Sequence, residues 1–314
     1  MSTHLVVGAG AVGTATAVLL ADQGHQVRLA SRSGSGPAHP GIERVRVDAA
    51  DAAGVLAAAR GAAAIYTCVN PPYTRWPTAW PPIAAALLAA AEQTGAVLAT
   101  TSNLYGYGPV AGPVTEDQPL AATGSKGRVR AQVWLDALAA HRAGRVRATE
   151  VRPSDFYGPG VGAAMLGERP LARLLAARSV PLLGDPDALH TVTYVPDVAR
   201  LLVTVAADER AWGRAWHVPS AAALTQRQTV GVFAAAAGVP MPKLSVPPKA
   251  ALALAGLVAP IVRELRETRH QFERDWVIDS TRAERTFGLA PTPLAEGARR
   301  TVEAIRAAGS VPVG

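Results

Sequence analysis

A glycine-rich turn at residues 8–13 is the first part of the sequence that could bind a ligand. Its glycines follow the spacing G-x-G-x-x-G, at Gly8, Gly10 and Gly13. An apolar run at residues 4–7 precedes the turn, and a helical pattern follows it. Strand, glycine turn and helix in this order present backbone N–H groups and a helix N-terminus to a pyrophosphate. The turn therefore predicts a dinucleotide site that includes Ala11 and Val12, with a glycine-loosened turn of another α/β protein as the alternative.

The residues after the second expected strand, at 26–30, indicate which dinucleotide would bind. Where NAD binds to such a fold, an acidic residue about 20 positions after the glycine turn accepts a hydrogen bond from the ribose 2′-hydroxyl. This chain has Ser31 and Arg32 there instead. A hydroxyl and a guanidinium suit a 2′-phosphate by charge and by geometry. We therefore expect NADP in preference to NAD; the alternative is a surface turn with an incidental arginine.

Lys126 is the second candidate for chemistry, because it is the one lysine in the first 242 residues. It begins a long helical pattern that continues through residues 127–142, at a place where the helix dipole does not favour positive charge. An ammonium group can hydrogen-bond ribose hydroxyls and shift the pKa of a neighbouring group in a way that arginine reproduces poorly. We interpret Lys126 as functional, with a chance position as the alternative.

The elements that would position these residues alternate between strands and helices. Expected strands cover residues 4–7, 26–30, 45–47, 62–68, 96–100 and 146–151, and expected helices cover 83–93 and 127–142. Such alternation with short connections indicates a parallel sheet with helices on both faces. We predict an α/β, Rossmann-like, doubly wound sheet with an NADP-binding domain at 1–165 and a smaller C-terminal substrate-binding lobe at 166–314. Residues 190–218 are expected to return to the first domain.

Loops follow the fourth, fifth and sixth expected strands, at the sheet edge where ligands bind in such folds. They cover residues 69–76, 101–108 and 152–160. Prolines and aromatic residues in the first loop predict an irregular segment there and exclude a helix. The residues that we expect on the substrate side are Trp76, Trp80, Asn103, Asp155 and His190. A tryptophan or histidine among them could instead belong to the core or the rim.

Composition excludes several classes of function. The net charge is +7, but basic and acidic residues alternate, as in 263–267, so that no block of like charge indicates nucleic-acid binding. The single cysteine, Cys68, permits neither an internal disulfide nor a zinc set, and we expect it to be a small buried apolar residue. No stretch resembles a signal peptide or a membrane span. We expect a cytoplasmic protein that binds small molecules, without a metal, a membrane or a nucleic acid.

The order of motifs resembles the extended and atypical short-chain dehydrogenase/reductase superfamily, often labelled NAD-dependent epimerase/dehydratase. The resemblance rests on the glycine turn, Asp48 after the third strand, Thr-Ser-Asn-Leu-Tyr-Gly at 101–106 and Arg-Pro-x-x-x-Tyr-Gly-Pro-Gly at 152–160, with family-like segments at 195–199 and 289–306. It implies that Asp48 contacts the adenine and Lys126 the nicotinamide ribose. It also implies that Thr101 is the catalytic serine or threonine, that Pro153 begins the loop beside the nicotinamide, and that the helices at 83–93 and 127–142 pair in a homodimer.

Two departures from the family pattern bear on the chemistry. The glycine spacing is G-x-G-x-x-G, whereas most extended members have G-x-x-G-x-x-G, which favours the atypical branch. The family's catalytic pair is Tyr-x-x-x-Lys, but Ala122 stands four residues before Lys126, and an alanine cannot exchange a proton. Candidate replacements are Tyr73, Tyr105, Tyr107, Tyr157, Thr123 and Ser125. We favour Tyr73 and Tyr107, and Asp155 could also serve if burial raised its pKa.

The sequence thus favours an NADP-dependent oxidoreductase or epimerase-like enzyme for a small polar metabolite. Two alternatives remain open. One is an NADP-binding sensor or scaffold without redox activity. The other is an isomerase, lyase or cyclase that uses the same fold without net redox change.

Overall fold

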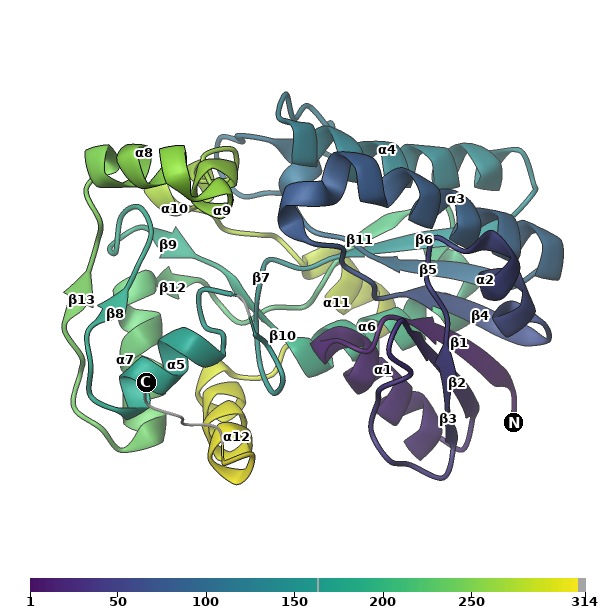
Figure 1. Ribbon diagram of the computed structural model, residues 1–314, viewed down its shortest axis with the longest axis horizontal. Coiled ribbons are helices and arrows are strands. Elements are labelled where there is room, and N and C mark those ends of the chain that lie inside the picture. Colours follow the sequence, from purple (N-terminus) through teal and green to yellow (C-terminus); the bar gives the residue numbers. More distant parts are fainter. Residues whose placement is uncertain (163, 310–314) are drawn as a thin grey trace.

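A seven-stranded parallel sheet forms the centre of the computed structural model, which describes residues 1–162 and 164–309 (Figure 1). In spatial order its strands are β11 (Ala215–His217), β6 (Arg147–Arg152), β5 (Val97–Thr101), β4 (Ala62–Thr67), β1 (Thr3–Val7), β2 (Gln26–Ser31) and β3 (Ile42–Arg46). Neighbouring strands are all parallel, so their carboxyl ends meet at one edge. The expected α/β, Rossmann-like sheet is confirmed.

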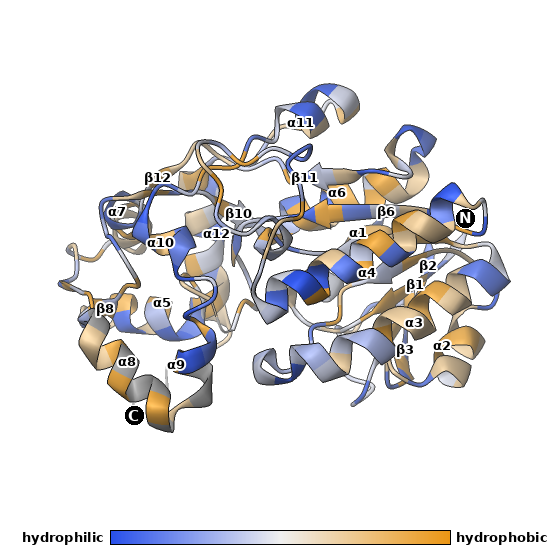
Figure 2. Ribbon diagram, turned by 90° about the horizontal axis from the view of Figure 1, so that it is seen from above, coloured by the Kyte–Doolittle hydropathy of each residue, from blue (hydrophilic) through white to orange (hydrophobic). Residues whose placement is uncertain are grey.

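Helices cover both faces of this sheet. On one face lie α1 (Ala11–Asp22) and α6 (Val195–Ala207), and on the other lie α2 (Ala52–Ala59), α3 (Trp76–Thr94) and α4 (Ser125–Arg142). Strand alternation supplies both cores: Leu5 and Val7 pack on the α3 side, and Val6 packs on the α1 side. In Figure 2, α2 and α3 are mostly hydrophobic, whereas α4 alternates between hydrophilic and hydrophobic residues.

The segment expected to be irregular, 69–76, contains no α-helix before Trp76, but the helix α3 starts earlier than the expected residue 83. A short 3-10 turn, η1 (Tyr73–Arg75), leads directly into the helix at Trp76, which is seven residues before the expected start. Pro77 occupies the first turn, where a missing N–H costs little, while Pro81 and Pro82 stand inside the helix. Trp76 and Trp80 are 3% and 1% exposed. Their burial against the sheet offsets the hydrogen bonds that the prolines forgo, which explains why the helix starts earlier than we expected.

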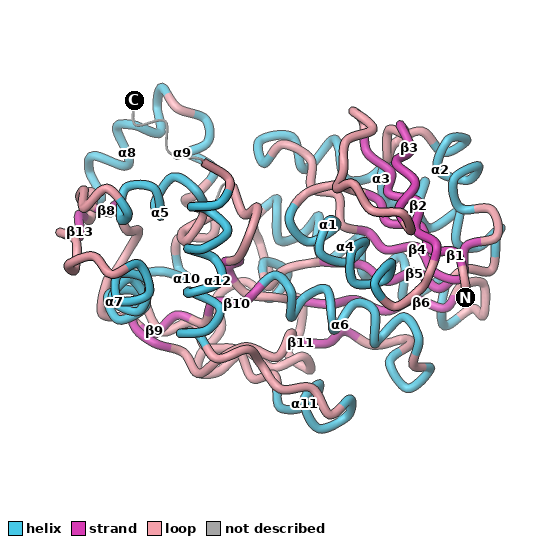
Figure 3. Tube along the Cα trace, turned by 90° about the horizontal axis from the view of Figure 1, so that it is seen from below, coloured by secondary structure: helices cyan, strands magenta, loops and turns pink. Residues whose placement is uncertain are grey.

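The later elements form a smaller lobe beside the carboxyl edge of the sheet (Figure 3). The short strands outside the main sheet are β7 (Asp155–Tyr157), β8 (Val180–Pro181), β9 (Leu189–His190), β10 (Val192–Tyr194), β12 (Leu224–Thr225) and β13 (Leu244–Ser245). The helices of the lobe are α5 (Glu168–Leu175), α7 (Gln226–Ala237), α8 (Lys249–Val258), α9 (Pro260–Glu264), α10 (His270–Glu273) and α12 (Leu294–Ala307). The helix α11 (Thr281–Phe287) instead packs on β11 of the main sheet. Phe233, Leu171 and Val302 join α7, α5 and α12 in one apolar core.

The lobe is tied to the N-terminus of α4 by one carboxylate. Glu267 Oε1 accepts hydrogen bonds from the backbone N–H groups of Lys126, at 2.8 Å, and Gly127, at 2.9 Å. A side chain at Gly124 would overlap this carboxylate, because its Cβ would lie 2.1 Å from Glu267 Cδ. A negative charge at the start of a helix is favourable, so Glu267 acts as a helix cap supplied from 140 residues away.

Within the described residues, every helix is too short or too polar to span a bilayer.

This cap predicts a measurable loss of stability. Replacing Glu267 by alanine leaves two N–H groups of α4 without their carboxylate partner, so the free energy of unfolding in urea should fall by about 1–2 kcal/mol. The matched control is Glu303→Ala, which removes an exposed carboxylate paired with Arg299 on the surface of α12 and should cost less than about 0.5 kcal/mol. Equal losses in the two variants would contradict the capping role.

Candidate active site

The glycine turn brings the N-terminus of α1 to the carboxyl edge of the sheet. Gly8 has φ +110°, and a Cβ there would lie 2.6 Å from the backbone of Cys68 at the end of β4. A Cβ at Gly13 would lie 1.8 Å from the carbonyl oxygen of Gly8. At Gly10, by contrast, a Cβ would have no neighbour within 4 Å among the described residues. The first and third glycines are therefore required by packing, and the second leaves the turn open to a ligand.

This open turn fits a dinucleotide pyrophosphate. Gly10 is the N-cap of α1, and no side chain of the described residues caps the helix there. The N–H groups of Ala11, Val12 and Gly13 thus begin a helix without a side-chain acceptor, and the helix dipole favours an anion at this point. The residues present therefore suit a nicotinamide dinucleotide.

Arginines lie at the carboxyl ends of β2 and β3, next to the glycine turn in the sheet. Ser31 ends β2 opposite Arg46 of β3, and Arg32 follows with an exposed side chain. The Ser31 hydroxyl donates to the carbonyl oxygen of Ser35 at 3.2 Å, which closes the turn after β2. Asp48 lies in the exposed turn after β3, where its Oδ1 accepts from the N–H of Ala50 at 3.0 Å. This edge therefore combines hydroxyls and guanidinium groups.

A cavity of ≈ 220 Å³ continues from the glycine turn toward the lobe. The site residues expected from the sequence that line it are Val12, Tyr73, Trp76, Trp80, Thr101, Asn103, Pro153 and Asp155. Further lining residues are Cys68, Tyr105, Arg130, Ser154, Gln271 and Trp276. Arg130 was missed although it stands four residues after Lys126 on α4, whereas Gln271 and Trp276 come from the distant lobe and leave no sequence signal. The parallel strands thus bring three loops and the lobe around one polar and aromatic cavity.

At the end of the cavity near β5, two side chains hydrogen-bond the backbone of the loop that follows this strand. Arg130 Nη2 donates to the carbonyl oxygen of Thr101 at 2.7 Å, and Asn103 Oδ1 accepts from the N–H of Tyr105 at 3.0 Å. The Thr101 hydroxyl lies 3.8 Å from Cys68 Sγ. Burial raises the pKa of Cys68 to about 12, so the group is a neutral thiol at physiological pH. Thr101 and Asn103 remain the groups of this loop that could hydrogen-bond a substrate.

Lys126 lies beneath the cavity and not on its wall. Its side chain is fully buried, its Nζ forms an ion pair with Glu264, and the same nitrogen lies 4.6 Å from the centre of the Tyr73 ring. The Tyr73 hydroxyl is 3.5 Å from the Thr268 hydroxyl. Burial raises the pKa of Tyr73 and raises that of Tyr105 well above its usual value. Both phenols are therefore protonated at neutral pH, and the lobe partner of Lys126 was not visible from its sequence neighbours.

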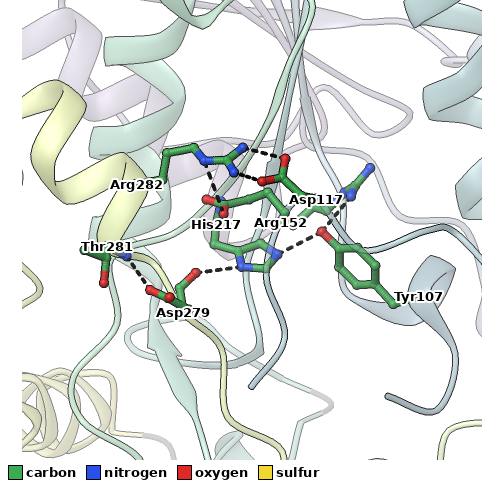
Figure 4. A network of polar contacts seen from close by, with 8 residues as sticks. Tyr107, Asp117, Arg152, His217, Asp279, Thr281 and Arg282 are labelled. Carbon is green, nitrogen blue, oxygen red and sulfur yellow. Dashed lines mark hydrogen bonds and ion pairs between the residues drawn. The ribbon is translucent and has the colours of Figure 1, made fainter. Parts of the chain in front are cut away.

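Tyr107, which we favoured as a proton donor from the sequence, does not line the cavity. Figure 4 shows its polar contacts. Its hydroxyl accepts from Arg152 Nη1 at 2.7 Å and donates to His217 Nε2 at 2.9 Å. His217 Nδ1 in turn donates to the carbonyl oxygen of Asp279 at 2.9 Å. Glu150 Oε1 accepts from Arg152 Nε at 2.6 Å within the same buried region. These contacts occupy the Tyr107 hydroxyl in a structural network.

Asp155 and His190 form a pair at the lobe side of the cavity. Asp155 Oδ2 is 2.7 Å from His190 Nε2, and His190 Nδ1 is 3.0 Å from the carbonyl oxygen of Gln271. The Asp155 side chain is 24% exposed and lines the cavity, while that of His190 is 1% exposed and lies behind it. The His190 ring stacks on Phe272, with centroids 4.7 Å apart. His190 thus reaches the cavity only through the carboxyl group of Asp155.

Residues 4–218 match the model of the NAD dependent epimerase/dehydratase family. The chain belongs to this family. As a family member it is an enzyme of the epimerase/dehydratase type. No curated protein sequence matches the chain.

Solved structures of epimerases and dehydratases share the complete fold of this family member. An epimerase from Methanothermobacter thermautotrophicus is 17% identical, with a TM-score of 0.81 over 98% of this chain and 92% of that one. UDP-glucose 4-epimerase from Thermotoga maritima, with UDP-glucose, is 18% identical, with a TM-score of 0.79 over 98% and 100%. A dTDP-glucose 4,6-dehydratase from Streptomyces venezuelae, with NAD bound, is 21% identical, with a TM-score of 0.76 over 98% and 97%.

In this epimerase/dehydratase family member, Ala122 is packed into the turn before α4. The N–H of Ala122 donates to the carbonyl oxygen of Gly106 at 3.1 Å. A Cβ at Gly127 would lie 2.3 Å from that of Ala122, so the two small residues pack against each other. Residue 122, where the family resemblance would place a tyrosine, is therefore a small residue packed closely against the backbone of α4.

The Tyr107 network predicts how stability depends on pH. Burial lowers the pKa of His217 to about 4. The unfolded chain binds a proton at this histidine below pH ~6.5, whereas the folded chain does so only below about 4. Protonation of His217 in the unfolded chain therefore leaves the free energy of unfolding unaffected above pH ~6.5 and lowers it as the pH falls from there toward about 4. Between pH 7 and pH 5 this histidine should lower the free energy of unfolding by about 2 kcal/mol.

Urea denaturation of the wild type and of His217→Asn at both pH values measures this effect. The asparagine side chain does not titrate, so the variant should lose about 2 kcal/mol less stability than the wild type between pH 7 and pH 5. His4, whose pKa burial also lowers to about 4, contributes equally to both proteins. Parallel stability curves would show that His217 is not held neutral by its buried surroundings.

Proposed function

We propose that the chain is an NADP-dependent oxidoreductase or epimerase-like enzyme that acts on a small, hydroxylated, polar substrate. The observation that carries the proposal is the continuous path from the glycine turn to the cavity: Val12 of α1 lines the same cavity as Asn103 and Asp155. A dinucleotide on the turn would therefore end beside polar side chains that can hold a substrate. The sugar nucleotides named for the similar epimerases and dehydratases support a substrate with a sugar-like ring.

The preference for NADP rests on the edge formed by β2 and β3. Ser31 and Arg46 are paired at the ends of β2 and β3, and the exposed Arg32 follows directly, so this edge offers a hydroxyl and two guanidinium groups to a ribose 2′-phosphate. Arginine matches the charge and the fork geometry of a phosphate group. In the NAD arrangement, a carboxylate would stand at the end of β2 to accept from the 2′-hydroxyl, and the sequence has none there.

Each remaining site residue has a proposed role. Gly8, Gly10, Ala11, Val12 and Gly13 hold the pyrophosphate, Asp48 the adenine and Pro153 the nicotinamide side, while Thr101 and Asn103 hydrogen-bond the substrate. The bound nicotinamide would accept or donate hydride. Lys126 supplies positive charge beneath Tyr73, with Glu264 as its counter-ion. Trp76 and Tyr73 give the substrate an aromatic wall.

We also propose a homodimer through the outer faces of α3 and α4. Leu88, Val129 and Val133 line an open apolar groove between these two helices, and apolar surface of this kind is covered in many oligomers. Light scattering that gives the mass of one chain would contradict this proposal.

Replacing Arg32 by alanine tests the cofactor. Loss of its contact with a 2′-phosphate should raise the Kd of NADP⁺ by about 10- to 100-fold, while the Kd of NAD⁺ should change by less than about twofold. Calorimetric titration measures both constants. Arg142→Ala, at the far end of α4, is the control for the lost charge and should leave both constants unchanged.

Turnover separates the enzyme from the alternatives. The proposal expects NADPH oxidation, followed by absorbance, with at least one member of a panel of sugar-like carbonyl compounds. Tight NADPH binding without oxidation across a broad panel would favour the sensor or scaffold instead. Equal weakening of NADP⁺ and NAD⁺ by Arg32→Ala would contradict recognition of the 2′-phosphate.

A further inference from the structure

Two buried histidines of this chain have the same contact at Nδ1 and different contacts at Nε2. His217 and His190 are 0% and 1% exposed, and each places Nδ1 against a backbone carbonyl oxygen, at 2.9 and 3.0 Å. A carbonyl oxygen can only accept a hydrogen bond, so each Nδ1 carries a proton. The protonation of each ring is then decided by the group that faces Nε2.

At His217 a neutral ring satisfies all contacts. The Tyr107 hydroxyl faces Nε2 at 2.9 Å and can donate its proton, because it accepts a separate hydrogen bond from Arg152. At His190 the facing atom is Asp155 Oδ2, at 2.7 Å. An ionised carboxylate has no proton to donate, and two lone pairs would repel at this distance. One proton therefore lies between His190 and Asp155.

We propose that Asp155 is the catalytic proton-exchange group that replaces the tyrosine missing at Ala122, with His190 as the positioning residue that stores its proton. The inference rests on the proposed function, because it supplies the proton that this reaction requires. In the resting pair the Nε2–H of an imidazolium donates to the Asp155 carboxylate in a charge-assisted hydrogen bond. The carboxyl group of Asp155 faces the cavity and connects the buried ring with a substrate oxygen.

The backbone holds this pair in place from three sides. Asp155 and Val192 are partners in the parallel pairing of β7 with β10, and His190 and Leu224 are partners in the antiparallel pairing of β9 with β12. A further bridge joins His190 with Trp276. The stacked Phe272 ring fixes the plane of the imidazole. The pair is thus set by main-chain contacts that do not depend on a bound ligand.

The cavity beside the Asp155 carboxyl group is lined by both neutral and charged side chains. The hydroxyls of Tyr73 and Tyr105 and the amide of Gln271 line the same cavity, and burial raises the pKa of both phenols. The cations on this side are Arg130, which lines the same cavity, and Lys126, which lies against the Tyr73 ring. The nearby carboxylates are Glu267, which contributes to the raised pKa of both phenols, and Asp275, whose Oδ1 accepts from the N–H of Leu189.

The proton balance of the step is simple. When a substrate carbonyl carbon gains hydride from a reduced nicotinamide, its oxygen requires one proton. The Nε2–H bond of His190 breaks as a proton moves onto the Asp155 carboxyl, and the resulting O–H bond breaks as the O–H bond of the product forms. The pair is left as a carboxylate and a neutral imidazole, and water restores its proton. Oxidation of a hydroxyl follows the reverse sequence from the deprotonated pair.

Nitrogen-15 NMR of histidine-labelled protein tests the stored proton without turnover. At pH 7 we expect both ring nitrogens of His190 to be protonated in the wild type, and one to be unprotonated in Asp155→Asn, whose amide can donate to Nε2. The His190→Gln variant assigns the signal, and the neutral ring of His217 is an internal control in all samples. A neutral His190 ring in the wild type, or an imidazolium that persists in Asp155→Asn, would overturn the proposal.

A second measurement separates this inference from the proposed function. Asp155→Asn should still bind NADPH, because the glycine turn that would hold the pyrophosphate is unchanged, yet lower kcat by about 100-fold or more. The pH profile of the residual rate of reduction in the variant should differ from the profile of the wild type. Failure of the wild type to bind NADPH would contradict the proposed function alone. An Asp155→Asn enzyme with wild-type kcat and pH profile would contradict the role of the pair.

Discussion

The close contact between α1 and β1 is the constraint on which the site depends. With hydrogen at Gly13, where a Cβ would lie 1.8 Å from the Gly8 carbonyl, the helix can start directly above the end of the strand. Its N-terminus therefore points at the sheet edge where β4 and β5 also end. The parallel register then brings the residues after each strand around one cavity, and the lobe closes its remaining side. The proposed binding of a dinucleotide and of a substrate both depend on this packing contact.

Beneath this cavity the chain arranges buried polar groups in two different ways. The Tyr107 hydroxyl accepts a hydrogen bond from the permanently charged Arg152 and donates one to the neutral ring of His217. Both hydrogen bonds therefore form without an additional proton. Asp155 and His190 satisfy their contact only with an added proton. Lys126 is balanced by Glu264 from the lobe. The first arrangement serves stability, and the second leaves a transferable proton at the cavity wall.

The sequence predicted the parts of this structure that depend on local patterns. The glycine spacing, the alternating strands and the loops after them follow from residues close together in the chain. The start of α3 at Trp76 was missed, because burial of Trp76 and Trp80 outweighs the prolines. Lys126 and Glu264 are 138 residues apart, and Asp155 and His190 are 35 apart, so their pairing requires the tertiary fold. Tyr107 could not be separated from Tyr105 by sequence, although a single turn sends one to the core and the other to the cavity.

The structure of the enzyme in complex with NADP⁺ tests the central claim most directly. The account predicts the pyrophosphate against the N–H groups of Ala11 and Val12, the 2′-phosphate beside Arg32, and the nicotinamide in the cavity that Pro153 and Asp155 line. A dinucleotide bound elsewhere, or a 2′-phosphate turned away from Arg32 and into solvent, would contradict it.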